Sequence, residues 1–207
     1  MATYSVLKKE DFKDFIALLA KRQKLVAPVH KGYNNYAFEE VTSGEEVALD
    51  YIPTILPPKK YFMPQEEKLI TFDSSKKKYE AVMEYEKLTI FGVHTCDLAG
   101  IQCLNIVFTD KPKDVNYLVR KNKVAIIGLE CTKYCDEYAS CKVMDNHLPN
   151  GGYDLFFTEL EDVFIIHINT QLGDDIVKRT KLFNVASDKH RKAVSYTHLR
   201  AHETSLH

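Results

Sequence analysis

The sequence predicts an α/β fold: a single domain with a mixed sheet, at least one β-α-β unit, and helices packed on the sheet. Two short apolar runs rich in β-branched residues, 88–93 and 124–129, have the pattern of buried strands. Between them, a helix is predicted from four apolar residues at three-to-four spacing: Leu98, Ile101, Leu104 and Val107. Asp97 stands where it can cap that helix. A right-handed crossover would make the strands parallel neighbours whose carboxyl ends share one edge.

The remaining elements follow from the same periodicities. Residues 9–25 carry the clearest amphipathic helix, because Phe12, Phe15 and Leu19 fall on one stripe. The further predicted elements are a strand at 36–41, a proline-rich connector at 51–65, a strand at 79–85, a hairpin of strands 154–160 and 163–168, and a short helix at 173–182.

The end of the chain differs in character from the rest. We expect residues 1–194 to form the α/β domain and residues 195–207 to be a non-native or disordered tail. The tail closely resembles the translated product of a common sequencing adapter, so its three histidines are left out of the search for a site. We therefore expect the natural protein to continue beyond residue 194.

Composition narrows the classes of function. With 45% hydrophobic and 28% charged residues, the chain can bury one sizeable core. Its formal net charge of -1 gives no general electrostatic reason to bind nucleic acid or an anionic membrane. No apolar stretch approaches the roughly 20 residues needed to span a bilayer, and no signal pattern opens the chain. We expect a cytoplasmic protein with neither nucleic-acid nor membrane partners, whose five cysteines are free thiols or ligands.

Four cysteines carry the leading functional hypothesis. Cys96 follows the first buried strand, and Cys131, Cys135 and Cys141 follow the second. If those strands are parallel neighbours, the four thiols meet at one sheet edge. Thiolates suit iron-sulfur clusters and zinc almost equally. The Cys-x3-Cys-x5-Cys spacing matches neither a ferredoxin run nor a zinc ribbon, so ordinary buried or reactive thiols remain the alternative.

Other candidate residues have simpler interpretations. Cys103 lies two helical turns beyond Cys96 and is expected to be a core thiol. His94 and His147 could complete a metal shell, but a surface or loop role is the simpler prediction. A thiol switch of Cys131 and Cys135 is disfavoured because their spacing is not Cys-x-x-Cys. The sequence contains no dinucleotide fingerprint or Walker motif.

Several separated motifs together carry a family resemblance. They are Thr54–Glu67, Phe91–Leu98, the cysteine loop Cys131–Cys141, and Gly152–Glu159. In this order they resemble the amino-terminal part of the iron-sulfur beta subunits of sulfhydrogenases and of the iron-sulfur subunits of anaerobic sulfite reductases. The resemblance covers about residues 5–190.

The resemblance implies a role in electron transfer within an oxidoreductase complex. Such subunits carry 4Fe-4S clusters, most of them in a later ferredoxin-like domain. They pass electrons between a flavin subunit that uses a nicotinamide nucleotide and a catalytic subunit of hydrogenase or sulfite-reductase type. Two positions depart from the family pattern: His94 and Thr95 replace Arg-Pro, and Ala139 replaces a cysteine. Cys135 would then supply the missing ligand.

The sequence thus predicts a fragment of a non-catalytic electron-transfer subunit with one cluster site. The proposed ligands are Cys96, Cys131, Cys135 and Cys141. The alternative is a zinc-bound or metal-free module that docks other subunits and has no redox role.

Overall fold

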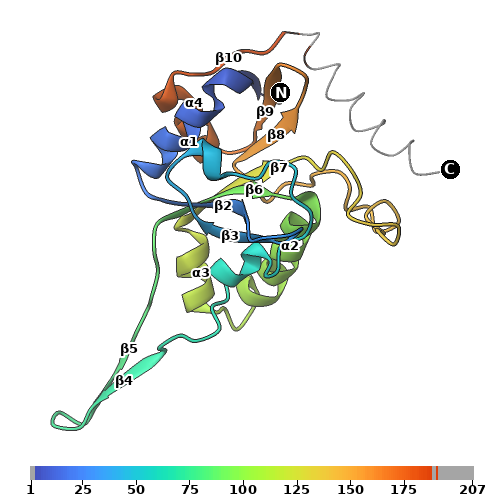
Figure 1. Cartoon of the computed structure of the whole chain (residues 1–207). Coiled ribbons are helices and arrows are strands. Elements are labelled where there is room, and N and C mark those ends of the chain that lie inside the picture. The colour runs from blue at the N-terminus through green and yellow to red at the C-terminus, as the bar shows by residue number, and fades with distance from the viewer. Residues whose placement is uncertain (1–2, 188–189, 191–207) are drawn as a thin grey trace.

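The central sheet of the computed structural model has eight strands, and the structure describes residues 3–187 and 190 (Figure 1). The strands are β1 (Thr3–Lys8), β2 (Lys24–His30), β3 (Tyr36–Glu40), β6 (Leu88–Val93), β7 (Val124–Leu129), β8 (Leu155–Glu159), β9 (Val163–Ile168) and β10 (Asn184–Val185). Their spatial order is β10-β1-β9-β8-β7-β6-β2-β3. The four strands β2, β6, β7 and β8 are parallel, and the other pairings are antiparallel. The predicted mixed α/β sheet is confirmed.

Helices cover both faces of this sheet. They are α1 (Phe12–Ala20), α2 (Thr95–Thr109), α3 (Val115–Lys121) and α4 (Gln171–Thr180), with short 3-10 turns at Lys9–Asp11, Gly44–Glu46 and Pro58–Tyr61. Neighbouring residues of β8 separate the two layers, because successive strand side chains point to opposite faces. Phe157 stacks on Phe15 of α1 at 5.5 Å between ring centroids. Phe156 and Leu98 of α2 instead crowd the Cα of Gly128 from the other face.

The predicted β-α-β unit is present. Strands β6 and β7 pair in parallel from Leu88 opposite Val124 onwards, and α2 and α3 form the crossover between them. Both strands are almost wholly buried, as expected for apolar runs covered on two faces. The predicted hairpin is also confirmed, since β8 and β9 are antiparallel and the Leu160 N-H donates to the Val163 carbonyl at 2.9 Å.

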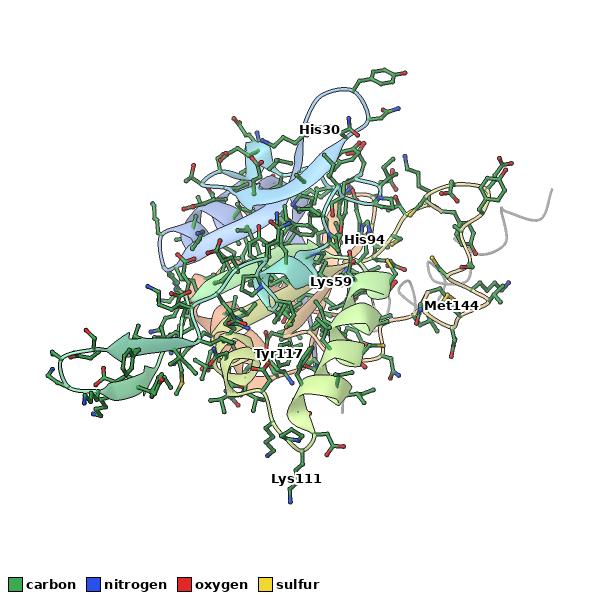
Figure 2. All side chains as sticks on the ribbon, turned by 90° about the horizontal axis from the view of Figure 1, so that it is seen from below. His30, Lys59, His94, Lys111, Tyr117 and Met144 are labelled. Atoms are coloured by element: carbon green, nitrogen blue, oxygen red, sulfur yellow. The ribbon has the colours of Figure 1, made fainter. Side chains whose placement is uncertain are left out.

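A separate two-stranded ribbon projects from the body. Its strands are β4 (Ile70–Asp73) and β5 (Lys78–Ala81), which pair only with each other. Figures 1 and 2 both show it reaching away from the central sheet. The strand predicted at 79–85 therefore begins one residue earlier, ends at Ala81, and belongs to this ribbon.

Two helix predictions need correction. The helix predicted for 9–25 is α-helical only over Phe12–Ala20, because the apolar run from Leu25 is buried in the sheet as β2. Asp97 was expected to cap α2, but the helix begins at Thr95 with His94 at the cap position, so Asp97 lies inside the first turn. The short helix predicted at 173–182 is found two residues earlier, with the Thr170 hydroxyl accepting from the Gly173 N-H.

The search for membrane-spanning segments covers the same residues. Within the part of the chain that the structure describes, no helix is both long and apolar enough to cross a membrane. The tail predicted for residues 195–207 lies outside the described residues.

A cysteine-lined candidate cofactor site

The carboxyl ends of β6 and β7 bring the four predicted ligands to one pocket. Cys96 is the second residue of α2, which follows β6, and Cys131 comes two residues after β7. The pocket is lined by Thr95, Cys96, Glu130, Cys131, Lys133, Tyr134, Cys135, Cys141 and His147. The convergence of four thiols from two separate segments, which follows from parallel pairing of the strands, is therefore found.

A backbone irregularity in β6 shapes the approach to Cys96. Gly92 has a φ of +83°, and the register with β7 shifts between Phe91 and Val93. A Cβ at Gly92 would stand only 2.9 Å from the Cδ of Pro28 on the neighbouring strand. Glycine is therefore required here, since L residues rarely adopt this φ and the neighbouring ring leaves no room.

An aromatic stack supports the same corner. The Tyr51 hydroxyl donates to the Gly92 carbonyl at 2.6 Å. The Tyr51 ring stacks on the imidazole of His94, with centroids 3.9 Å apart and planes 8° from parallel. His94 is buried, and that burial lowers its pKa to about 4, so the ring is neutral at physiological pH. This neutral stack fixes the start of α2 just before Cys96.

The loop that carries the other three cysteines is attached at both ends. At its start the Glu130 N-H donates to the Phe157 carbonyl at 2.9 Å, next to the sheet. Near its end the Gln102 amide of α2 donates to the Asn150 carbonyl at 2.8 Å. Between these anchors, Figure 2 shows the segment around Met144 extending from the body.

Bonds within the loop hold its middle together. The Asn146 N-H donates to the Cys141 carbonyl at 2.8 Å, and the Met144 N-H donates to the Ser140 carbonyl at 3.0 Å. The Asp136 carboxylate accepts from the Tyr138 N-H at 2.8 Å. Because these bonds start and end inside the loop, they would survive a displacement of the whole loop relative to the sheet.

Burial and mutual proximity disfavour ionised thiols at this site. The pKa of Cys96 is raised to about 12, mainly by desolvation and further by Asp97 and nearby cysteines. Desolvation also raises the pKa of Cys131, with added contributions from Cys96, Cys135 and Cys141. These contributions from neighbouring sulfur atoms place the four thiols within electrostatic reach of one another. A bound cation would remove the penalty on ionisation, because metal ligation requires thiolates.

Asp97 lies beside the thiols in a similarly desolvated position. Burial raises its pKa to about 6, and Lys59 opposes that shift. Lys59 belongs to the 3-10 turn at 58–61 and is labelled together with His94 in Figure 2. The carboxyl group contributes to the local field at the start of α2, where a capping role was expected for it.

The donor set fits a thiolate-bound cofactor, while the pocket is narrow. Four sulfur donors surround a cavity of about 40 Å³, which is room for little more than water. Across the described residues, no three His, Cys, Asp or Glu side chains are grouped as a single-ion site. A cluster would need the 131–147 loop to lie further out, and the loop's internal hydrogen bonds permit that.

Sequence reasoning misplaced some residues and missed others. Cys103 was expected in the core, but it is exposed on α2 and does not line the pocket. His147 was expected to be a surface or loop histidine, yet it lines the pocket with its side chain 16% exposed, 3.8 Å from Asp145. Glu130 was overlooked, although a carboxylate between a buried strand and a cysteine was a usable signal.

Comparison with known proteins places the chain. No family model matches it. It is 34% identical over 174 residues to the protein named Sulfhydrogenase 2 subunit beta from Pyrococcus furiosus, which covers 84% of this chain and 51% of that relative. The chain therefore spans about half the length of the curated relative it matches. Identity at this level over most of the described domain shows that the chain is related to the sulfhydrogenase beta subunits.

Proposed function

We propose that Cys96, Cys131, Cys135 and Cys141 jointly hold one 4Fe-4S cluster, and that this domain serves as an electron-transfer module of a hydrogenase-type oxidoreductase complex. The observation that carries the proposal is that four thiols from two separate segments line one pocket at the carboxyl edge of a parallel sheet. Ligand sites in open α/β sheets are found at this edge. Kinship with a sulfhydrogenase subunit supports the same cofactor class.

The arrangement of the thiols favours a cluster over a single ion. A cube cluster takes one thiolate at each of its four irons, so its ligands form a wider ring than the tetrahedron around one zinc. The four cysteines ring the pocket without closing on a common point. Outward movement of the loop would widen this ring further, as a cluster requires, whereas zinc requires the thiols to draw together.

The chain's own residues would prepare the site for a negatively charged ligand set. Cys96 lies in the first turn of a fifteen-residue helix, where free N-H groups and the helix dipole favour negative charge. Lys133 lines the same pocket. When bound, the cluster supplies one-electron redox chemistry, with a potential set by hydrogen bonds to sulfur, net charge and solvent exposure. The exposed Cys96 side of the pocket is the natural route for electrons to a partner.

The proposed partners follow from the relationship to a hydrogenase complex. We infer that a flavin and nicotinamide-nucleotide subunit stands on one side of the electron path. A catalytic subunit of hydrogenase or sulfite-reductase type stands on the other. The domain itself catalyses no reaction in this proposal, and a reducing cytoplasmic setting suits its free thiols.

Anaerobic reconstitution tests the proposal. The full chain is incubated with ferrous iron and sulfide, desalted, and analysed for iron, acid-labile sulfide, visible absorption and electron paramagnetic resonance after reduction. We expect iron and sulfide in equal amounts, a broad visible band that bleaches on reduction, and a signal from the reduced cluster. A colourless, iron-free chain after this treatment contradicts the proposal.

A zinc titration of the same chain separates the structural alternative. The tetrathiolate donor set would also suit zinc, which forms closed four-coordinate sites. If the site is a zinc module, zinc binds tightly, raises the thermal unfolding temperature, and prevents iron uptake. If the site is a cluster site, iron and sulfide give the larger rise in unfolding temperature and zinc gives the smaller one.

A further inference from the structure

The β4–β5 ribbon and its flanking residues 68–86, called the arm below, are firmly fixed to the body at their base. Glu67, just before the arm, forms an ion pair with Arg120 of α3. The Arg120 Nε also donates to the Phe62 carbonyl at 2.8 Å. The Asn116 amide donates to the Val82 carbonyl at 3.4 Å, and the Lys123 ammonium lies 5.5 Å from the centre of the Tyr85 ring. The arm is thus held at its root while its strands extend away from the body (Figure 1).

One face of the arm is apolar and packs against nothing in the described chain. Paired residues of an antiparallel ribbon share a face, and the register sets Ile70 opposite Ala81 and Phe72 opposite Tyr79. Ile70, Phe72 and Tyr79 are 63%, 54% and 71% exposed. The opposite face carries the pairs Thr71 with Glu80 and Asp73 with Lys78, which are polar. An isolated two-stranded ribbon is marginally stable in water, so a clean apolar face of this kind indicates a protein contact.

The tip of the arm is basic and has a defined shape. Its turn carries three consecutive lysines, Lys76, Lys77 and Lys78. The Asp73 carboxylate accepts from the Ser75 N-H at 2.9 Å and the Lys76 N-H at 3.1 Å, which closes the turn. Lys77 takes a φ of +50° in this turn. Lys77 is in no ion pair within the described part of the chain, so its charge is available to a partner.

The root of the arm is acidic. A hollow of about 370 Å³ there is lined in part by four glutamates: Glu66, Glu67, Glu84 and Glu86. Glu67 pairs with Arg120, and Glu86 pairs with Lys24 at 3.0 Å. Within residues 3–187, Glu66 and Glu84 make no ion pair and are exposed. Two carboxylates at the root therefore remain available to cations from outside.

We propose that two copies of this chain form a two-fold dimer by packing their arms face to face and antiparallel. In this arrangement the apolar faces around Phe72 and Tyr79 cover each other. A two-fold axis through the middle of the arms automatically sets each tip against the partner's root, because both arms have the same length. The Lys76–Lys78 tip then meets the Glu66 and Glu84 root, so one axis satisfies both the apolar and the charge complementarity.

The expected interface is modest in size. Each exposed large side chain contributes on the order of 100 Å², and the tip and root contacts at both ends add to that area. The total is about 1,000 Å², the small end of specific interfaces. The dimer should therefore dissociate on dilution. Strand β10 lies on the side of the molecule away from the arm, so this late part of the described chain does not cover the apolar face (Figure 1).

Sedimentation velocity of the full 207-residue chain over a wide concentration range is the first test. We expect a monomer–dimer equilibrium. The double variant Phe72→Thr, Tyr79→Thr keeps strand-forming residues but removes the aromatic contacts, and should weaken the dimer by about tenfold or more. The matched control Thr71→Val alters only the polar face and should leave the dimer unchanged. Thermal unfolding of both variants at low concentration verifies that the monomers remain folded.

Charge reversal tests the tip-to-root geometry. Lys77→Glu, Lys78→Glu reverses the tip, and Glu66→Lys, Glu84→Lys reverses the root; each variant alone should dimerise more weakly because like charges meet twice. An equimolar mixture of the two should form a heterodimer, since both contacts are then between opposite charges. A wild-type chain that stays monomeric at all concentrations overturns the proposal. A dimer insensitive to the Phe72 and Tyr79 variant, or a mixture that fails to associate, does so as well.

Discussion

The loop 131–147 and the arm 68–86 are two excursions from the same sheet, and they are built in opposite ways. The loop turns its sulfur atoms toward a shared pocket, and its middle is held by its own hydrogen bonds. The arm is anchored at the root by a buried ion pair and turns aromatic side chains outward. The first construction surrounds a small group with donors, and the second presents area to another protein. Segments outside the core therefore show their purpose by which groups they leave unsatisfied.

The largest expected effect separates the pocket cysteines from the remaining one. Cys131→Ser should remove most of the iron retained after anaerobic reconstitution, because a cube cluster needs its thiolate ligands. Cys103→Ser is the matched control, since Cys103 is exposed on α2 and lies outside the pocket. Iron and sulfide analysis of the two variants measures the difference. Equal iron in both variants would remove the distinction drawn between pocket and helix thiols.

The next effect compares a core aromatic with an aromatic of the arm. Phe157 is fully buried and contacts Phe15 and Phe91, so Phe157→Ala should lower the free energy of unfolding by about 3–5 kcal/mol. Phe72→Ala should change it by only about 0.5 kcal/mol when measured at low concentration, where the chain is monomeric. Urea unfolding of both variants gives the two values. A large loss for Phe72→Ala would mean that the arm packs on its own body.

The anchor of the arm gives an intermediate effect. Arg120→Met should destabilise the chain by about 1–3 kcal/mol, because it leaves the half-buried Glu67 without its partner and the Phe62 carbonyl without a donor. The double variant Arg120→Met, Glu67→Leu should recover part of this loss, since the isolated carboxylate is then gone. Thermal unfolding checks both. No recovery in the double variant would show that the ion pair is not what fixes the root.

The smallest effect is a pH dependence on the sheet side opposite α1. Burial lowers the pKa of His167, whose Nδ1 lies 2.8 Å from the Tyr153 hydroxyl. A histidine with a depressed folded-state pKa contributes stability that is present above its unfolded value of about 6.5 and is lost as the pH falls through the folded value. His167→Gln should therefore lose less stability than wild type between neutral and mildly acidic pH. Parallel pH-dependent slopes for the two proteins would contradict this.

Much of the fold was accessible from sequence because periodicity reports burial directly. The strands at 88–93 and 124–129 are buried on both faces and form the predicted parallel pair. The end of helix α1 was misjudged because Leu25 continues its apolar stripe, and only the sheet contact of β2 decides between helix and strand there. The short strands β1 and β4 were not predicted, since their pairing partners are distant in sequence or specific to the ribbon.

The candidate site was predictable to the level of residue convergence. Parallel pairing of two strands was enough to bring Cys96 toward the loop that begins at Cys131. Burial of His147 and exposure of Cys103 could not be predicted, because both depend on how an irregular loop folds back on α2. Whether the four thiols act as ligands remains a prediction.

Iron K-edge X-ray absorption of the anaerobically reconstituted full chain is the most direct test of the shared cluster. The proposal predicts an iron environment made entirely of sulfur, with neighbouring irons at a second, well-defined distance. An oxygen or nitrogen shell without iron neighbours would contradict it, because such a spectrum means that the four cysteines do not bind a common cluster.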